Sequence, residues 1–383
     1  MGFNPRPGLT KILSDFTAAT GIKATIQVTP WDQYWTMLEA GATGGSMPDV
    51  FWMHSNEFAR YAQYDMLLDL TARIKASKKL EMDKFPKDIV MLYNAKGKQL
   101  AMPKDVDTIA LWYNKTMFDK AGIKYPDASW TWDTFRAAAK KLTKADGSQY
   151  GYTLRPSEDQ TGWYNMVYSM GGEIISADKK KSGFDNPNTI KALSFMESLI
   201  KDGSLPPYQL ITENKEEALF MAGKVAMVTM GSWTISTLCN NDYVKAHCNL
   251  AVLPKDAATG KRISIYNGLG WAAAANTKNP DAAWALIEYL GTKPVQQKHS
   301  DLGVAISAYQ GTAAKWVSTY PAFNLQAHLD MLADIVMRPY SKTTVKWENM
   351  AIDKLINLWT GKVSAEPVCK DIAVEMNKIL KEE

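Results

Sequence analysis

The residues with the clearest chemical potential in this sequence are aromatic. The chain carries 13 tryptophans and 17 tyrosines among 383 residues. Flat rings offer apolar faces to the C–H side of a sugar ring, and Asp, Asn, Arg and Tyr can hydrogen-bond its hydroxyls. Several aromatic residues fall near the predicted ends of helices and strands: Trp31, Tyr34, Trp35, Trp52, Trp163, Trp233, Trp271 and Tyr340. As a set, their positions favour a carbohydrate-binding surface.

Core packing is the competing interpretation for any single tryptophan, because large aromatic side chains dominate protein interiors. We assign five of them to the core: Trp35, Trp112, Trp132, Trp284 and Trp359. The functional argument therefore depends on the remaining rings near element ends.

Asp107 is the carboxylate that most needs an explanation. It lies in the run from Pro103 to Lys115, which is predicted as one strand that leaves a first domain and enters a second. β-Branched and aromatic residues favour an extended, buried path there, and an acidic residue in such a run is costly without a partner. Two interpretations stay open. The carboxylate either caps a neighbouring turn or faces a cleft between two domains, where it accepts hydrogen bonds from a polar ligand.

Signatures of catalysis, metal binding or cofactor binding do not assemble. The four histidines are scattered without an HExxH pattern, and neither GxSxG nor GxxxxGK[ST] occurs. The segment Gly268–Ala273 matches GxGxxA, but a dinucleotide site needs a helix to start at the glycines, and 276–280 is predicted as a loop. A glycosidase would need two carboxylates roughly 5–10 Å apart, and the sequence neither suggests nor excludes such a pair. We expect no cofactor, no metal site and no catalytic residues.

Length and composition favour two domains. Single cores stop growing near ~250–300 residues, whereas this chain has 383 residues, of which 46% are apolar. The net charge of +4 is spread over short basic groups such as Lys179–Lys181, which argues against nucleic-acid binding. No run approaches the ~18 apolar residues of a membrane span, and no signal-peptide pattern opens the chain.

The cysteines leave two interpretations open. Cys239 and Cys248, nine positions apart, could form a disulfide around an exposed loop, or they could be, with Cys369, three free thiols.

Hydrophobic periodicity predicts alternating helices and strands in both domains. The first domain is predicted to hold helices at 7–20, 30–40, 56–64 and 84–92, strands at 23–28 and 49–53, and a hairpin at 95–98. Next come helices at 117–121, 132–142, 186–203 and 213–222, strands at 224–230 and 263–271, and helices at 281–290, 326–337, 345–359 and 367–380. We predict an α/β fold in which each domain is a mostly parallel sheet flanked by helices. Trp52 and Trp233 each lie at the carboxyl end of a predicted strand, where open α/β sheets bind ligands.

Several longer motifs occur together in one order: Met47–His54, Ala110–Lys115, Phe118–Ile123, Ser129–Phe135, Phe220–Met227, Gly231–Trp233 and Asn279–Trp284. Jointly they resemble the extracellular solute-binding proteins of ATP-binding-cassette sugar importers, the group similar to maltose-binding protein. The order and spacing agree over nearly the whole chain. Each motif alone is weak evidence, and the set is specific.

The resemblance implies a periplasmic-binding-protein fold of two lobes joined by a multi-segment hinge. The N-terminal lobe would be 1–109 with 275–322, the C-terminal lobe 110–274 with 323–383, and the hinge would lie near 107–113, 270–275 and 320–325. A mono- or oligosaccharide would be held between the lobes, and their closure would be presented to membrane permease subunits. The chain would act as a monomer outside the cytoplasm, in a periplasm or lipid-anchored at the outer face of the cell membrane.

The resemblance also implies site residues. Trp52 and Trp233 are similar to the stacking tryptophans of the two lobes, and Asp107 falls where the family places a hinge carboxylate on sugar hydroxyls. The segment Arg338–Tyr340 resembles the late basic and aromatic ligand contacts. Weaker candidates by position are Asn4, Trp31, His54, Asn56, Asp159, Trp163, Gly268 and Trp271. Family members start with a leader and a strand, whereas this sequence begins almost at the loop that follows that strand.

The leading hypothesis is a carbohydrate-binding subunit of an importer, without catalytic activity. One alternative is a glycan-cleaving enzyme with an aromatic cleft. Another keeps the scaffold but binds a non-sugar such as a peptide or a polyamine. A cationic ligand would call for fewer tryptophans and more carboxylates, so we rank it below a sugar.

Overall fold

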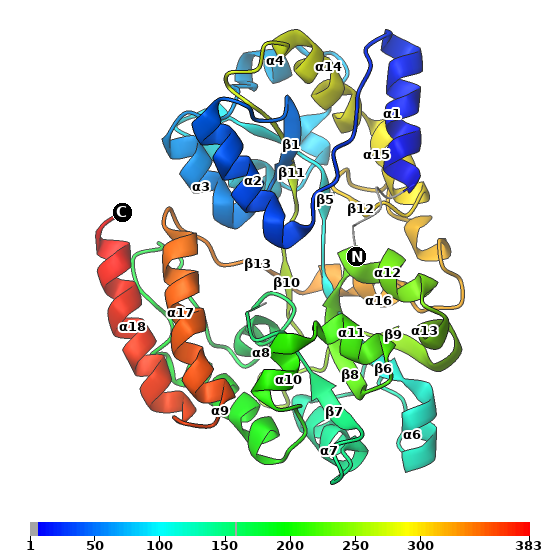
Figure 1. Ribbon diagram of the computed structural model, residues 1–383, viewed down its shortest axis with the longest axis vertical. Helices are drawn as coiled ribbons and strands as arrows, with labels where there is room; N and C mark the ends of the chain where they lie inside the picture. Colours follow the sequence, from blue (N-terminus) through cyan, green and yellow to red (C-terminus); the bar gives the residue numbers. More distant parts are fainter. Residues whose placement is uncertain (1–6, 158) are drawn as a thin grey trace. The chain divides into compact units, whose positions relative to one another are not determined.

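The computed structural model describes residues 7–157 and 159–383, and the chain divides into two compact units (Figure 1). Unit 1 contains the chain up to Val106 together with Asn267–Thr319, and unit 2 contains Asp107–Tyr266 with Tyr320–Glu383. The chain therefore passes between the units three times.

The predicted lobe boundaries differ most from these passages at the second one. Strand β11 (Gly270–Ala273) pairs with two strands of unit 1, so the chain passes into unit 1 at Asn267 rather than after residue 274. The hinge function of the three passages stays a prediction.

Unit 1 consists of helices around a three-stranded sheet. Before the first passage its elements are α1 (Pro7–Thr20), α2 (Trp31–Gly44), β1 (Val50–Met53), α3 (Ser55–Gln63), α4 (Thr71–Ala76), η1 (Met82–Lys84), α5 (Lys87–Leu92), β2 (Asn94–Ala95), β3 (Lys98–Gln99), β4 (Ala101–Pro103) and β5 (Asp105–Val106). After the chain returns they are β11, α14 (Pro280–Gly291), α15 (Lys293–Asp301), β12 (Ile306–Ser307) and η3 (Trp316–Ser318). The sheet order is β1-β11-β4, and its middle strand β11 is buried along its whole length.

Unit 2 consists of a four-stranded sheet with more helices around it. From the first passage its elements are β6 (Ile109–Asn114), α6 (Lys115–Ala121), α7 (Trp132–Leu142), β7 (Tyr150–Thr153), α8 (Tyr164–Ser169), α9 (Pro187–Lys201), α10 (Tyr208–Glu213), α11 (Glu216–Met221), β8 (Val225–Gly231), η2 (Ser232–Thr234), α12 (Ile235–Asn240), α13 (Asp242–His247), β9 (Cys248–Ala251) and β10 (Ser264–Tyr266). After the third passage they are α16 (Gln326–Asp330), η4 (Met331–Ala333), β13 (Ile335–Met337), α17 (Thr344–Trp359) and α18 (Ala365–Lys381). The sheet order is β7-β8-β6-β9.

The core of unit 2 lies between this sheet and its helices. Every residue of β6 is buried, as expected for a strand covered on both faces. Helices α17 and α18 run side by side (Figure 1) and supply Trp347, Leu355 and Ile372 to the same apolar cluster. Burial of this size is the main stabilising term of such a unit.

The predicted helices are largely confirmed. Those at 132–142, 281–290, 345–359 and 367–380 match α7, α14, α17 and α18 to within two residues at each end. Thr131 caps α7 as expected, with its hydroxyl oxygen accepting from the backbone N–H of Thr134.

Strand direction departs from the expectation of mostly parallel sheets. Among the described strands, the pairs in the unit 1 sheet and the pairs of β6 with β8 and β9 are antiparallel, whereas β7 with β8 and β10 with β13 are parallel. In unit 1 the chain goes out through β4 and comes back through β11. These two strands are neighbours in the sheet and run in opposite directions.

Three predicted segments are broken in the structure. The run Pro103–Lys115 is not one strand, because β4 pairs with β11, β5 with β12, and β6 with β8 and β9. The segment 263–271 splits into β10 of unit 2 and β11 of unit 1. The helix predicted at 326–337 ends early, since Ile335–Met337 forms a parallel pair with β10. Partners distant in the sequence override the local periodicity in each case.

Two further predictions fail locally. The helix predicted at 213–222 starts only at Glu216, because Asn214 is extended and separates α10 from α11. The strand predicted at 23–28 has the alternating pattern, yet none of the described residues pairs with it in a ladder. An extended segment becomes a strand only where a neighbour accepts and donates its backbone hydrogen bonds.

All three cysteines are buried free thiols, so the disulfide alternative for Cys239 and Cys248 is not formed here. Burial raises the pKa of each thiol to about 12. Of the described helices, none has both the length and the apolar character needed to cross a membrane.

A buried histidine lies against the first passage of the chain. The ring of His328 in α16 is fully buried, and its Nδ1 lies 3.1 Å from the carbonyl oxygen of Thr108. In return, the Thr108 hydroxyl donates to the His328 carbonyl oxygen at 2.7 Å. Burial lowers the pKa of His328 to about 3, although the hydrogen bond to Thr108 opposes the shift. The imidazole is therefore neutral at neutral pH and donates from Nδ1.

We expect this histidine to make unit 2 less stable in acid. The folded-state pKa lies below the unfolded value of ~6.5, so between those values the unfolded chain binds a proton that the folded chain does not. The stabilisation is complete above pH ~6.5 and falls by about 1.4 kcal/mol per pH unit as the pH decreases toward the folded value. Urea unfolding at pH 7, 6, 5 and 4 measures it.

His328→Asn is the matched variant, because the amide retains a donor near the Nδ1 position and does not titrate. As the pH is lowered from 7 to 4, the free energy of unfolding of the variant should decrease less steeply than that of the wild type. Parallel pH profiles for the two proteins would contradict this account.

Candidate functional site

The strongest candidate group lies in unit 1, where two tryptophans meet a buried ion pair. Trp52 of β1 is directly opposite Trp271 of β11 in the antiparallel register, and their ring centroids are 6.1 Å apart. Directly opposed residues share one face of a sheet. The Lys104 ammonium lies 4.7 Å from the Trp52 centroid and 5.9 Å from that of Trp271. Trp52 is half-buried, so part of its ring is open to solvent.

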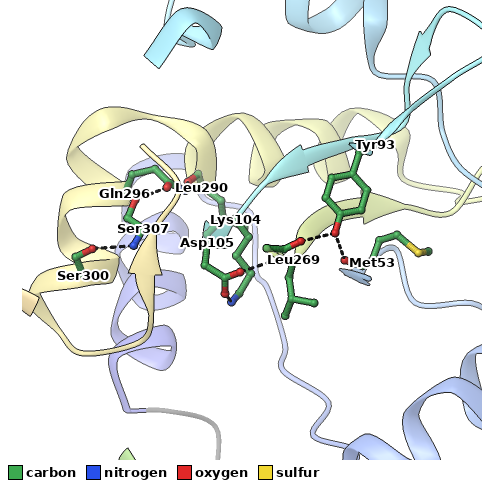
Figure 2. A network of polar contacts seen from close by, with 10 residues as sticks. Met53, Tyr93, Lys104, Asp105, Leu269, Leu290, Gln296, Ser300 and Ser307 are labelled. Carbon is green, nitrogen blue, oxygen red and sulfur yellow. Dashed lines mark hydrogen bonds and ion pairs between the residues drawn. The ribbon is translucent and has the colours of Figure 1, made fainter. Parts of the chain in front are cut away.

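The positive charge of Lys104 is compensated by the carboxylate of the next residue in the chain. The Lys104 side chain is only 2% exposed and forms an ion pair with Asp105. Asp105 also accepts a hydrogen bond from the backbone N–H of Leu269 at 2.8 Å, and Figure 2 shows the three residues together. A buried charge is tolerated only when it is paired and hydrogen-bonded. We call Trp52, Trp271, Lys104 and Asp105 the unit 1 group.

The segment around Gly268 holds this group together. A Cβ at Gly268 would lie 2.1 Å from the carbonyl oxygen of Asp105, so only glycine permits this approach. The Tyr93 hydroxyl lies 2.5 Å from the Gly268 carbonyl oxygen. It also lies 2.9 Å from the carbonyl oxygen of Met53 (Figure 2). Gly268, predicted as a ligand contact, thus has a clear packing role.

A second aromatic cluster adjoins the same strand. Trp31 packs against Tyr34, Trp35 and His54, with ring centroids 5.9, 5.3 and 5.6 Å away. The Tyr34 hydroxyl donates to the Trp52 carbonyl oxygen at 2.8 Å, and burial raises the pKa of that hydroxyl well above its usual range. Trp35 is half-buried in this cluster, which corrects its assignment to the core, and Trp284 is half-buried as well.

His54 starts helix α3 and is fixed from both ring nitrogens. Its Nδ1 accepts from the backbone N–H of Asn56 at 3.4 Å, and its Nε2 lies 3.0 Å from the side-chain amide of Asn267. With Nδ1 as acceptor, a neutral ring carries its proton on Nε2, and the Asn267 amide must then turn its oxygen toward it. The imidazole therefore caps the helix, and Asn56 contributes its backbone.

In unit 2 the predicted stacking residue follows the sheet directly. Trp233 lies in η2, just after β8, and is half-buried. A Cβ at Gly231 would lie 2.2 Å from the Trp233 ring, so the ring folds back over the glycine that ends the strand. The position at the carboxyl end of a strand is the one the sequence predicted.

Asp107 has an identified partner. Its Oδ1 accepts a hydrogen bond from the side-chain amide of Gln160 at 2.7 Å. Gln160 is buried and was not among the residues predicted from the sequence. No motif marks it, because the segments 154–157 and 159–163 are neither helix nor strand.

Two predicted ligand contacts pair with each other instead. Arg338 Nη2 lies 2.9 Å from an oxygen of Asp159, and Nη1 lies 2.8 Å from an oxygen of Glu348. Burial by itself lowers the pKa of the Arg338 guanidinium, but the two carboxylates outweigh it and the net shift is upward. Arg338 and Asp159 are both buried, so the structure assigns them to internal packing of unit 2.

The remaining candidates are dispersed. Trp163 is 2% exposed and packs on Tyr164 and Phe184 in the unit 2 core, which corrects its prediction as a ligand contact. Tyr340 is half-buried, with the Lys179 ammonium 3.2 Å from its ring centroid. Asn4 lies outside the described residues. Within residues 7–157 and 159–383, no three His, Cys, Asp or Glu side chains are grouped so as to hold a metal ion.

Solved structures identify the class of the fold. An ABC substrate-binding protein from Listeria monocytogenes, determined with cycloalternan, superposes with a TM-score of 0.90 over 98% of this chain and 96% of that one, at 23% identity. The fold is accordingly that of the periplasmic binding proteins.

Sequence comparison identifies the family. The family described as bacterial extracellular solute-binding protein matches residues 4–297, and this chain belongs to it. A Brucella abortus (strain 2308) protein named as a binding protein is 25% identical over 94% of this chain and 86% of its own length. The galactooligosaccharide-binding protein of Bacillus subtilis (strain 168) is 25% identical over 75% of this chain and 66% of its own length.

The buried ion pair of the unit 1 group predicts an asymmetric mutational pattern. Lys104→Met leaves the Asp105 carboxylate buried without its ammonium, which should lower the free energy of unfolding by about 3–5 kcal/mol. Adding Asp105→Asn removes the remaining charge while keeping an acceptor for Leu269, so the double variant should recover much of the loss. Urea unfolding measures both.

Lys96→Met is the control, because Lys96 and Asp65 form an exposed pair 3.7 Å apart. That change should stay within about 0.5 kcal/mol of the wild type. A Lys104→Met protein as stable as this control would show that the buried pair has no structural role.

Proposed function

We propose that this protein captures a neutral carbohydrate outside the cytoplasm and delivers it to the permease of an ABC importer, without chemical change to the sugar. The observation that carries the proposal is the unit 1 group. It sets a half-buried tryptophan beside a second indole and a buried ion pair. An aromatic face suits the C–H side of a sugar, and the buried ion pair beside it holds the two rings in place.

Charge compensation favours a neutral ligand over an ionic one. In unit 1 the Lys104 charge is balanced by Asp105. An anionic sugar would face the adjacent carboxylate, and a cationic ligand would face the ammonium, so each would meet a like charge at close range. A neutral sugar meets neither repulsion.

Unit 2 contributes Trp233 and Asp107 to the proposal. Trp233 is half-buried at the end of β8, and the Asp107 carboxylate is held by Gln160. Carboxylates that accept hydrogen bonds are well suited to distinguishing the orientation of hydroxyl groups, because an unpaired polar group in a binding site is costly.

The relatives support a carbohydrate by name. The Listeria protein was determined with cycloalternan, and the Bacillus relative is named for galactooligosaccharides. Because the identities are 23% and 25%, the particular sugar does not carry over. Membership of an extracellular family supports a location outside the cytoplasm, and the name of the Listeria protein supports a permease partner. We propose a monomeric binding subunit, periplasmic or lipid-anchored.

Ligand binding should depend on one indole in each unit. Trp52→Ala and Trp233→Ala should each weaken the binding of the best sugar at least tenfold, the equivalent of about 1.4 kcal/mol. Intrinsic fluorescence titrated with maltose, cycloalternan and galacto-oligosaccharides, with an oligogalacturonate and a chitosan oligomer as charged probes, gives the affinities. The neutral sugars should bind more tightly than the charged ones.

Trp284→Ala is the control, because Trp284 of α14 is another half-buried indole of unit 1 outside the group. It should leave the affinity within about twofold of the wild type. Wild-type protein that responds to no sugar, or tryptophan variants that bind like the wild type, would refute the site. Sugar recovered intact after long incubation separates this function from the glycan-cleaving alternative, which would release reducing ends.

A further inference from the structure

A buried polar cluster in unit 2 connects to the Asp107 carboxylate. It contains Asp159, Gln160, Asn165, Arg338 and Glu348, all of them buried. Buried polar groups are costly unless they are hydrogen-bonded, so a network of this size needs an explanation. We call these five residues the Arg338 cluster.

Gln160 is the member that contacts Asp107. Its Nε2 lies 2.7 Å from Asp107 Oδ1, the length of a strong hydrogen bond to a charged acceptor. A carboxylate can accept about four hydrogen bonds through its two oxygens. The bond from Gln160, a buried donor, fixes the position of Oδ1.

The backbone of Gln160 is itself held in place. The Asn165 amide donates to the carbonyl oxygens of Gln160 at 2.7 Å and Gly162 at 3.1 Å. The Asn165 oxygen accepts from the backbone N–H of Ile265 in β10 at 2.8 Å. A loop without regular structure is therefore fixed to a strand of the same unit.

The residue before Gln160 is fixed from the other side. Asp159 accepts from Arg338 at 2.9 Å, and Arg338 also lies 2.8 Å from Glu348 of α17. The Arg338 backbone N–H donates to the Tyr266 carbonyl oxygen at 2.8 Å, which continues the pairing of β13 with β10. The loop that carries Gln160 is thus tied to β10, β13 and α17.

We infer that Gln160 is a positioning residue for ligand recognition: it orients the Asp107 carboxylate, and the other four residues of the Arg338 cluster hold Gln160 in place. The inference rests on the proposed function. It adds which residues make the binding site selective for one orientation of the sugar hydroxyls. It also gives the buried Arg338 and Asp159, predicted as ligand contacts, an indirect role in the same site.

The first test removes the donor and keeps the size of the side chain. Gln160→Met should lower the affinity for the tightest-binding neutral sugar about tenfold and reduce the ratio between that sugar and its epimers. The control is Gln149→Met, because Gln149 is a half-buried glutamine of unit 2 whose amide donates to the Leu142 carbonyl oxygen at 2.6 Å. The control should keep the wild-type affinity and the wild-type ratio.

The second test makes the effect depend on pH. Gln160→Glu places a carboxyl group beside Asp107, and two carboxyls at this distance share one proton. The variant should bind sugar at pH 5 and lose affinity toward pH 8, as the shared proton leaves and the two charges repel. Asp159, Arg338 and Glu348 are present in both proteins, so their titration cancels when the variant is compared with the wild type.

A ligand-free readout separates failure of this inference from failure of the proposed function. Carboxyl carbon NMR of Asp107, assigned with Asp107→Asn, should show a higher titration midpoint in Gln160→Met than in the wild type, because a donated hydrogen bond favours the charged form. If the wild type binds no sugar but the Asp107 midpoint is still higher in Gln160→Met, the proposed function is refuted, whereas the orienting contact between Gln160 and Asp107 is supported.

Unchanged affinity, unchanged sugar ratio and a flat pH profile in both Gln160 variants would overturn the inference, even if the wild type binds sugar. A loss of affinity equal to that of Gln149→Met would also overturn it, because general weakening of unit 2 would then explain the effect.

Discussion

A lysine buried against two indoles is the constraint on which unit 1 depends. Lys104 can lose its water only because Asp105 compensates its charge and the Trp52 and Trp271 rings offer it their faces. That arrangement in turn requires β1 and β11 to pair in a register that sets the two tryptophans opposite each other. It also requires the chain at Gly268 to approach Asp105 more closely than any side chain would allow. Sheet register, backbone approach and charge balance are thus linked.

Unit 2 uses its buried charges differently. In unit 1 the ion pair lies beside the proposed binding surface, whereas Arg338 bridges two carboxylates inside the unit. The Lys104–Asp105 pair sums to zero charge, which suits a neutral ligand beside it, whereas the Arg338 cluster holds one more carboxylate than cations. In the proposed function, aromatic rings would supply contact area and fixed polar groups would supply selectivity.

Much of the fold could be predicted from local patterns. Helix α7 was predicted to the residue, because its cap at Thr131 and its apolar spacing are both local. The predictions that failed concern segments whose structure depends on distant parts of the chain. Strand β13 was predicted as the end of a helix, but it is a strand because it pairs with β10, some 70 residues earlier in the chain. The strand predicted at 23–28 failed for the same reason, since alternation indicates a strand only when a partner exists and none of the described residues pairs with this segment.

The candidate site was predictable in its aromatic part and hidden in its polar part. Trp52 and Trp233 stand at strand ends, which the sequence shows directly. No motif marks Lys104 and Asp105, because a charged pair inside an apolar run has no characteristic spacing. Arg338 and Asp159 were predicted as ligand contacts because type and position match, but only the structure shows that they form a buried ion pair.

The distribution of cysteine offers a means of observing one unit at a time. All three thiols of the sequence lie in unit 2, and all are buried and protonated. A thiol reagent can therefore react only after the interior of unit 2 has opened, while unit 1 stays chemically silent. The rate of thiol modification reports the opening equilibrium of unit 2 alone. No engineered label is needed to distinguish local unfolding of unit 2 from that of unit 1.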